Sequence, residues 1–219
     1  MSSSLTKEEI NRKLLHGLAI VLPVGIFYGP DSFEVSRAVA CLIISMLFAF
    51  SLGVEVVRLK YSPFRFWFSS HFGSMMRESE SKQLTGATYV LAGSVICSLI
   101  SLYSESAAAA AFLGLTLFIL GDAVAALVGK AFGRIKVGSK TVEGALGCWF
   151  FCVLAATFVF PQLPTFMSDW GGHLTFGHIM GISAAVTLLE FIPIRMGRVI
   201  LNDNLYVPGI VAMVALIIR

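Results

Sequence analysis

The sequence predicts an all-α, polytopic integral membrane helical bundle, and three observations lead to this fold class. Of the 219 residues, 57% are hydrophobic and 13% are charged, and the mean hydropathy is +0.84. Ordinary soluble domains carry about 25% charged residues. Apolar runs close to the roughly 20 residues that cross a bilayer recur along the chain. Basic residues, finally, are concentrated in alternate connections between these runs.

Seven apolar runs are candidate transmembrane helices, and no polar segment between them is large enough for a separate soluble domain. We therefore expect a single integral membrane domain over residues 1–219. The first and last runs are short, so the expected number is about seven. The runs are Leu14–Tyr28, Val35–Val57, Leu84–Tyr103, Ala107–Val128, Gly144–Phe160, Phe176–Ile192 and Leu205–Ile218.

The distribution of charge predicts the orientation and a polar site. Positive charge in short loops stays on the cytoplasmic side, and with the N-terminus inside only Arg37 and Arg219 are basic residues on the outer side. Acids at the ends of spans cost about 2.5–3.5 kcal/mol each unless they are paired, hydrated or metal-bound. Single acids are also explained by snorkelling to the headgroups. Together, five inner-side acids indicate one polar site facing the cytosol: Glu55, Asp122, Glu143, Glu190 and Asp203.

The segment at about 61–78 has the pattern of an amphipathic helix. Phe64, Trp67 or Phe68, and His71 or Phe72 recur at helical spacing, whereas Arg65 and Ser69 fall elsewhere. Such a helix lies in the membrane interface. We expect it to anchor the chain at the inner face, or to form the floor of a site that a lipid reaches from the headgroup plane.

The loop at about 120–144 carries the chemistry that holds polyphosphates. Glycines let a ligand approach the main chain, backbone amides at a helix start carry partial positive charge, and lysines neutralise phosphate oxygens. A neighbouring acid indicates a divalent cation shared with the phosphates. A helix is expected to end near Asp122 and another to begin at Thr141. The residues that fit this description are Asp122, Gly129, Lys130, Gly133, Gly138, Lys140, Thr141 and Glu143.

Within that loop, GRIKVGSKT (residues 133–141) differs by one inserted residue from the phosphate loop of soluble nucleotide hydrolases. That motif requires a preceding strand, whereas a membrane helix is expected here, so only its physical chemistry applies. Near the N-terminus, RKLLH places Arg12, Lys13 and His16 on about the same helical face. They form a second candidate group for binding an anion.

Three blocks of this sequence resemble the CTP-dependent lipid-alcohol kinases, which include dolichol kinase, phytol kinase and the yeast-type diacylglycerol kinase. The blocks are RKLLH (Arg12–His16), GDAVAALVGKAFG with KTVEG (Gly121–Gly144), and Glu190 with NDNLYVP (Asn202–Pro208). QLTGATYVL (Gln83–Leu91) gives weaker support. The chain is similar to the compact members and lacks the extra spans of animal dolichol kinases, which leaves the acceptor lipid open.

The resemblance implies transfer of the γ-phosphate of CTP to the hydroxyl of a membrane lipid alcohol, such as diacylglycerol, a polyprenol or phytol. Asp122, Glu143 and Asp203 are then the catalytic and Mg²⁺-ligand candidates. The residues expected to bind the nucleotide are Arg12, Lys13, His16, Gly129, Lys130, Gly133, Gly138, Lys140, Thr141 and Asn204. Glu190 is expected either to orient ligands or to brace the helices.

Two other functions fit parts of the pattern. A cytidylyltransferase that attaches CMP to phosphatidate also needs CTP and Mg²⁺, and a small transporter would use Asp122 and Glu190 along an ion pathway. The expected partners are CTP, a lipid alcohol and the bilayer, and the charge gives no reason to expect nucleic acid. We expect a bacterial inner membrane or endoplasmic reticulum protein, and the sequence leaves open whether it forms a homo-oligomer.

Overall fold

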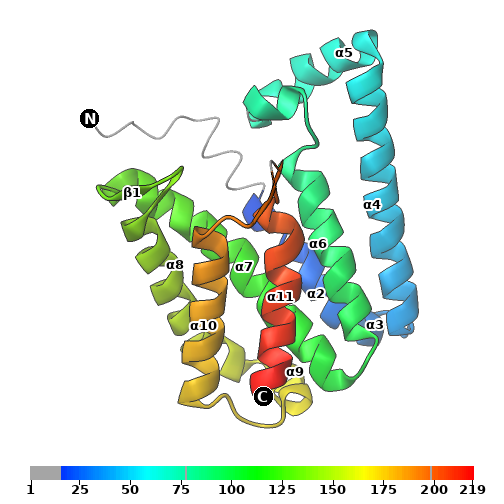
Figure 1. Cartoon of the computed structure of the whole chain (residues 1–219). Helices are drawn as coiled ribbons and strands as arrows, with labels where there is room; N and C mark the ends of the chain where they lie inside the picture. Colours follow the sequence, from blue (N-terminus) through cyan, green and yellow to red (C-terminus); the bar gives the residue numbers. More distant parts are fainter. Residues whose placement is uncertain (1–15, 77, 198) are drawn as a thin grey trace.

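The computed structural model describes residues 16–76, 78–197 and 199–219, and over these residues the chain is a helical bundle (Figure 1). This confirms the all-α prediction, because strands account for only two short hairpins in the described chain. The helices are α2 (Val21–Phe27), α3 (Gly29–Ser32), α4 (Arg37–Lys60), α5 (Ser62–Phe72), α6 (Gly86–Ser101), α7 (Glu105–Phe132), α8 (Val142–Leu154), α9 (Pro164–Trp170), α10 (Phe176–Phe191) and α11 (Asp203–Ile218).

Each of the seven predicted apolar runs coincides with a helix, but the lengths differ. Within the described residues, three helical stretches are long and apolar enough to cross a membrane: Arg37–Lys60, Glu105–Phe132 and Val142–Gln162. The third continues α8 through a π-helical turn, η3 (Ala155–Val159), and a 3₁₀ turn, η4 (Phe160–Gln162). Four further helices are apolar but shorter: His16–Phe27, Gly86–Ser101, Phe176–Phe191 and Asp203–Ile218. The structure therefore supports a membrane protein without confirming seven spans.

The central element is α7, which packs against α8, α11, α6, α10, α2 and α9. Its alanine run, Ala107–Ala111, is at most 1% exposed. Small side chains let neighbouring helices approach closely, so this run forms the crowded middle of the core. Side chains of Phe27, Phe112, Phe160 and Phe166 pack around one another beside it.

Polar residues mark where several helices begin. Ser36, Ser104 and Thr141 are the N-caps of α4, α7 and α8, and each side chain accepts a hydrogen bond from a backbone N–H of the first turn. These caps satisfy amides that have no partner inside the helix. The predicted helix start at Thr141 is confirmed, whereas the predicted helix end near Asp122 is wrong, because α7 continues through Asp122 to Phe132.

Two hairpins that the sequence pattern did not predict connect the helices near one end of the bundle. Strands β1 (Lys136–Val137) and β2 (Lys140–Thr141) join α7 to α8, and β3 (Arg195–Met196) and β4 (Val199–Ile200) join α10 to α11. Each turn has a glycine with positive φ, 63° at Gly138 and 60° at Gly197, a conformation that glycine adopts without the cost of a Cβ clash.

The predicted interfacial helix is present but shorter than residues 61–78. It is α5, which starts with Pro63 in its first turn and is followed by the 3₁₀ turns η1 (Gly73–Met75) and η2 (Glu78–Ser81). No residue of α5 is buried, and the rings of Phe64 and Trp67 stack with centroids 5.5 Å apart. The helix lies across the end of α4, at the same end of the molecule as β1 (Figure 1).

A buried ion pair fixes this end of α4. Arg58 is 0% exposed and Glu55 is 3% exposed, and the Arg58 guanidinium donates to the Glu55 carboxylate and to the carbonyls of Glu80 and Gln83. The other Glu55 oxygen accepts from the Thr85 hydroxyl at 2.6 Å. Glu55 is therefore a structural residue that ties α4 to the start of α6, and it does not contribute to the polar site expected from the sequence.

Replacing Arg58 by Met should lower the free energy of unfolding by about 3–5 kcal/mol, because the Glu55 carboxylate would stay buried without its countercharge. Lys60→Met removes the same charge from an exposed position of α4 and should change stability by less than about 0.5 kcal/mol. Denaturant titration in detergent measures both variants. Equal unfolding midpoints for the two would contradict this role of the pair.

Candidate functional site

Three carboxylates from three different helices converge in the structure. Asp122 comes from α7, Glu190 from the last turn of α10 and Asp203 from the first residue of α11. One oxygen of each lies within 4.8 Å of the others. Glu190 is 4% exposed, and the side chains of Asp122 and Asp203 are 18% and 29% exposed. We call these three residues the acid cluster.

Lys140 on β2 is the countercharge of the acid cluster. Its ammonium donates to a Glu190 carboxylate oxygen at 2.7 Å, to an Asp203 carboxylate oxygen at 2.9 Å and to the Glu190 carbonyl. Carboxylate oxygens are the ligands that divalent magnesium prefers, so the donor set fits a Mg²⁺ ion.

The acids also determine the titration of Lys140. Burial alone would lower the pKa of this lysine, but the negative charges of Asp203 and Glu190 outweigh burial and raise the pKa above its ordinary value of 10.5. Lys140 is therefore fully charged at neutral pH. In that form it can neutralise either the carboxylates or an incoming phosphate.

His16 and Asn204 border the acid cluster. The Nε2 atom of His16 lies 3.3 Å from a carboxylate oxygen of Asp122, and the imidazole is 14% exposed. The backbone N–H of Asn204 donates to the side chains of Asn202 and Asp203 in the first turn of α11. This cap orients Asp203 at a helix N-terminus, where the helix dipole favours negative charge.

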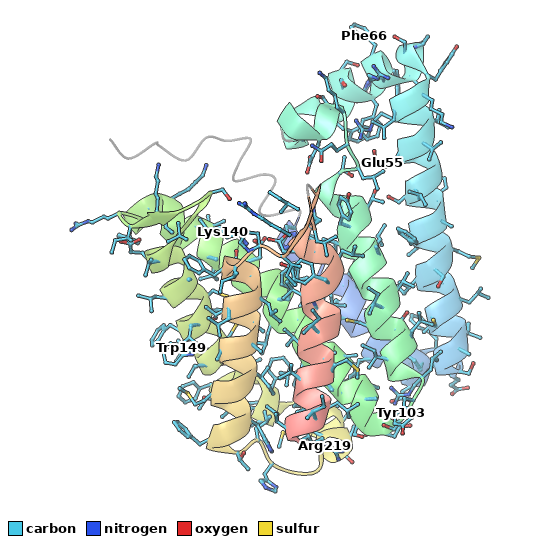
Figure 2. All side chains as sticks on the ribbon, viewed as in Figure 1. Glu55, Phe66, Tyr103, Lys140, Trp149 and Arg219 are labelled. Carbon is cyan, nitrogen blue, oxygen red and sulfur yellow. The ribbon has the colours of Figure 1, made fainter. Side chains whose placement is uncertain are left out.

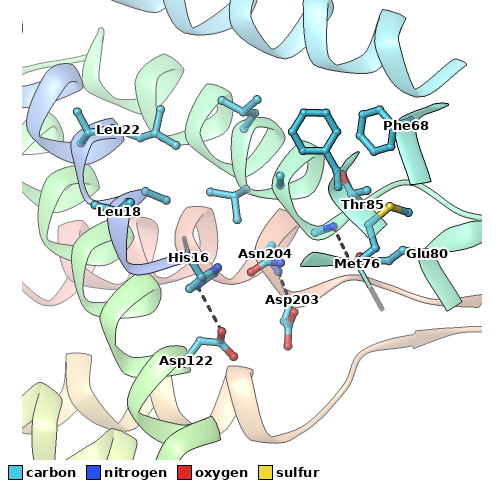
Figure 3. Close-up of a pocket in the computed structure, with 17 residues that line it drawn as sticks. His16, Leu18, Leu22, Phe68, Met76, Glu80, Thr85, Asp122, Asp203 and Asn204 are labelled. Carbon is cyan, nitrogen blue, oxygen red and sulfur yellow. Dashed lines mark hydrogen bonds and ion pairs between the residues drawn. The ribbon is translucent and has the colours of Figure 1, made fainter. Parts of the chain in front are cut away.

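A pocket of about 490 Å³ opens beside these groups (Figure 3). Figure 3 shows His16, Asp122, Asp203 and Asn204 close together, and Leu18 and Leu22 to one side of them. These leucines belong to the helical segment His16–Phe27, which we call the first helix. Phe68 of α5, Met76, Glu80 and Thr85 lie on the other side. Residues of α6 complete the wall. The pocket is thus mainly apolar, with one polar group of lining residues at His16, Asp122, Asp203 and Asn204 and a second at Glu80 and Thr85.

The glycines of the predicted phosphate loop serve packing rather than an open cradle. A Cβ on Gly129 would lie 2.6 Å from the Thr141 hydroxyl oxygen, and a Cβ on Gly144 would lie 2.6 Å from the Ala125 carbonyl oxygen. Gly133 ends α7 and is also closed in by Thr141. These contacts let α7, β2 and α8 approach one another, and this approach positions Lys140. Gly138, in contrast, forms the exposed hairpin turn.

The structure does not bring Glu143 into the acid cluster. Both of its carboxylate oxygens accept from the backbone N–H of Ile135 at 3.2 Å. Glu143 therefore closes the base of the β1–β2 hairpin, and this geometry does not support the expected metal-ligand role. Lys130 lies in the last turn of α7, half-buried. Arg12 and Lys13 lie outside the described residues.

Glu190 is the functional candidate that the sequence reading left undecided. Its signal in the sequence is a carboxylate near the end of an apolar run, which is costly unless the charge is compensated. The compensating residue, Lys140, is 50 positions away, so no local pattern reveals the pair. Figure 2 shows Lys140 next to the end of α10, at the same end of the bundle as Glu55.

The contribution of Lys140 to the free energy of unfolding should decrease only at high pH. Because its pKa is raised on folding, this contribution is complete below the unfolded value of 10.5 and is lost as the pH rises through the folded-state pKa. The difference in unfolding free energy between the wild type and Lys140→Met should therefore be constant from neutral pH to pH 10 and should shrink above it. A difference that shrinks already at neutral pH would contradict the assignment.

A comparison of sequences finds a similar archaeal protein. The chain is 32% identical over 139 residues to an uncharacterized protein of Methanocaldococcus jannaschii, and the match covers 63% of this chain and 60% of the archaeal protein. This chain therefore spans less than two thirds of that relative. No family model matches the present chain, and no solved structure matches it significantly.

Proposed function

We propose that this protein is a CTP-dependent lipid kinase that transfers the γ-phosphate of CTP to the hydroxyl of a membrane lipid alcohol. The observation that carries the proposal is the junction of two unlike surfaces: the acid cluster with Lys140, and the apolar pocket that ends on it. A phosphate site and a lipid site must meet in this way in any such enzyme. The resemblance to the lipid-alcohol kinases in three sequence blocks agrees with it.

The polar side has the groups that phosphoryl transfer requires. Catalysis of this reaction is mainly positioning and neutralisation of charge on the transferring group. Lys140 supplies a permanent positive charge, and we expect Lys130, Arg12 and Lys13 to bind further phosphate oxygens. Mg²⁺, held by Asp122, Glu190 and Asp203, would neutralise phosphate charge when bound.

The apolar side fits the acceptor. A hydroxyl at the polar end of the pocket would lie next to His16 and Asp122, while its hydrocarbon chain contacts leucines and phenylalanines. The Asp122 carboxylate can hold the imidazole of His16 in one orientation, as carboxylates do for histidine bases elsewhere. In this proposal His16 accepts the proton of the acceptor hydroxyl.

The proposal places seven helices across a bacterial inner membrane or the endoplasmic reticulum membrane, with the site facing the cytosol. Asp122 follows Glu105 by 17 residues of α7, about 26 Å along the axis, which is near the far border of a hydrocarbon layer about 30 Å thick. Helices of 16 residues, such as α6 and α10, are about 24 Å long. Local bilayer thinning or flanking polar residues accommodate such lengths.

A cytidylyltransferase is the second candidate, because the same acid cluster suits any metal-assisted reaction of CTP. The position of a radiolabel separates the two activities. With CTP labelled on the γ-phosphate, a kinase transfers the label to lipid, whereas a cytidylyltransferase releases it in pyrophosphate. The transporter hypothesis has less support, since the acid cluster contacts Lys140, which lies at one end of the bundle (Figure 2).

Asp122→Asn should reduce γ-phosphate transfer from CTP to lipid by at least about 100-fold. The change removes the negative charge with which Asp122 would bind Mg²⁺ and pairs with His16. The label in extracted lipid measures the activity. Asp31→Asn, in the short outer helix α3, is the control and should keep full activity. A folded Asp122→Asn protein with normal turnover would remove Asp122 from the site.

Lys140→Met should weaken CTP binding by roughly 10–100-fold, the effect of losing one charge-assisted contact worth about 1.5–3 kcal/mol. Lys60→Met, which changes an exposed lysine on α4, should leave the affinity unchanged. Equilibrium binding of labelled CTP to the purified protein measures both. An unchanged affinity in a folded Lys140→Met variant would count against this lysine as a phosphate ligand.

A further inference from the structure

We propose that the pocket binds only the part of the lipid alcohol chain next to the hydroxyl, and that the rest of the chain leaves sideways into the bilayer. This inference rests on the proposed function and adds how the acceptor is recognised. It predicts an enzyme that discriminates acceptors by the structure near the hydroxyl and not by total chain length.

The pocket is shorter than an extended lipid chain. Along the first helix its lining runs from His16 to Leu22, and along α6 from Thr85 to Leu91. Each stretch covers seven residues, about 9–10 Å at 1.5 Å per residue. One leaflet of the hydrocarbon layer is about 15 Å thick, so an extended lipid chain is longer than the pocket.

The exposed fractions of the lining residues indicate on which side the pocket opens. Lining residues on the first helix are strongly exposed, with Leu18 at 67% and Val21 at 66%, whereas Val90 on α6 is 5% exposed. Phe72 of α5, which also lines the pocket, is 42% exposed. Within the described residues, the pocket is therefore closed at Val90 of α6 and most exposed along the first helix and at Phe72 of α5. The exposed rim is apolar, so hydrocarbon chains suit it better than water.

The wall at α5 is rigidly supported, which makes the pocket a defined shape near the hydroxyl. The Arg58 guanidinium lies 5.6 Å from the ring centre of Phe68 and also holds the carbonyl of Glu80. Both Phe68 and Glu80 line the pocket. The buried Arg58–Glu55 pair thus fixes two lining residues, and selectivity among acceptors should be greatest for groups that contact this wall.

Photocrosslinking of the full-length protein in detergent tests the site without relying on turnover. One probe is a long-chain alcohol with a diazirine close to the hydroxyl, and the second has the diazirine at the far end of the same chain. The first should label pocket residues such as Leu22 and Val90, and the second should label residues outside the pocket. Labelling of the pocket by both probes, or by neither, would overturn the inference.

The methyl ether of the first probe distinguishes an acceptor from an ordinary bilayer lipid. Because the ether cannot donate a hydrogen bond to His16 or Asp122, its labelling of the pocket should fall severalfold. Equal labelling by alcohol and ether would mean that any lipid chain occupies the pocket, and it would overturn the acceptor role.

A pocket-filling variant provides the kinetic test. Ala87 lines the pocket and is not buried, so Ala87→Phe should raise the KM for the lipid alcohol by about tenfold and leave the KM for CTP unchanged. Leu99→Phe, on the same helix outside the pocket and 54% exposed, is the matched control. Equal lipid KM values in the two variants would contradict the inference.

The outcomes separate this inference from the proposed function. If the γ-phosphate is transferred to lipid but the proximal probe crosslinks only outside the pocket, the kinase proposal stands and the pocket is not the acceptor site. Crosslinks from the proximal alcohol probe without any CTP-dependent transfer would retain the pocket as a lipid-alcohol site and refute the kinase.

Discussion

The structure depends on keeping the carboxylates at the ends of apolar helices electrically compensated. Glu190 and Asp203 lie at the ends of α10 and α11, and Lys140 reaches both from the hairpin that follows α7. A lone buried charge would be expensive, and breaking such a pair costs several kcal/mol. The ion network therefore joins three elements, β2, α10 and α11. The close approach of α7 to α8 at Gly129 and Gly144 holds the hairpin that carries Lys140 beside these acids.

A second compensated charge determines the other side of the pocket. Arg58 and Glu55 are enclosed by the segment between α5 and α6, and their hydrogen bonds to backbone carbonyls and to Thr85 leave that segment little freedom. The apolar pocket lies between these two polar networks, with its polar edge at Asp122 (Figure 3). Rigid ionic anchors with apolar walls between them are an arrangement suited to a substrate that is polar at one end only.

Several parts of this description follow from local sequence pattern. Apolar runs predicted where the seven longest apolar helices of the described residues lie, and the helix start at Thr141 was predicted as well. The pattern also indicated Asp122, Lys140 and Asp203 as functional candidates, and the structure brings them together. Gly129 and Gly133 were interpreted as part of a phosphate cradle, whereas they pack against Thr141. A glycine beside a ligand and a glycine beside another element cannot be distinguished from the sequence alone.

The sequence by itself determined the helical class, the concentration of charge at one end and the residues able to do polar chemistry, since these depend on composition and periodicity along the chain. Only the tertiary structure decided which charges pair. It joined Lys140 to Glu190 across 50 residues, assigned Glu143 to the base of its own hairpin, and buried Glu55 with Arg58. The physical reason is that the energy of a charge inside a protein depends on its neighbours in space, and distant helices supply those neighbours only after they pack.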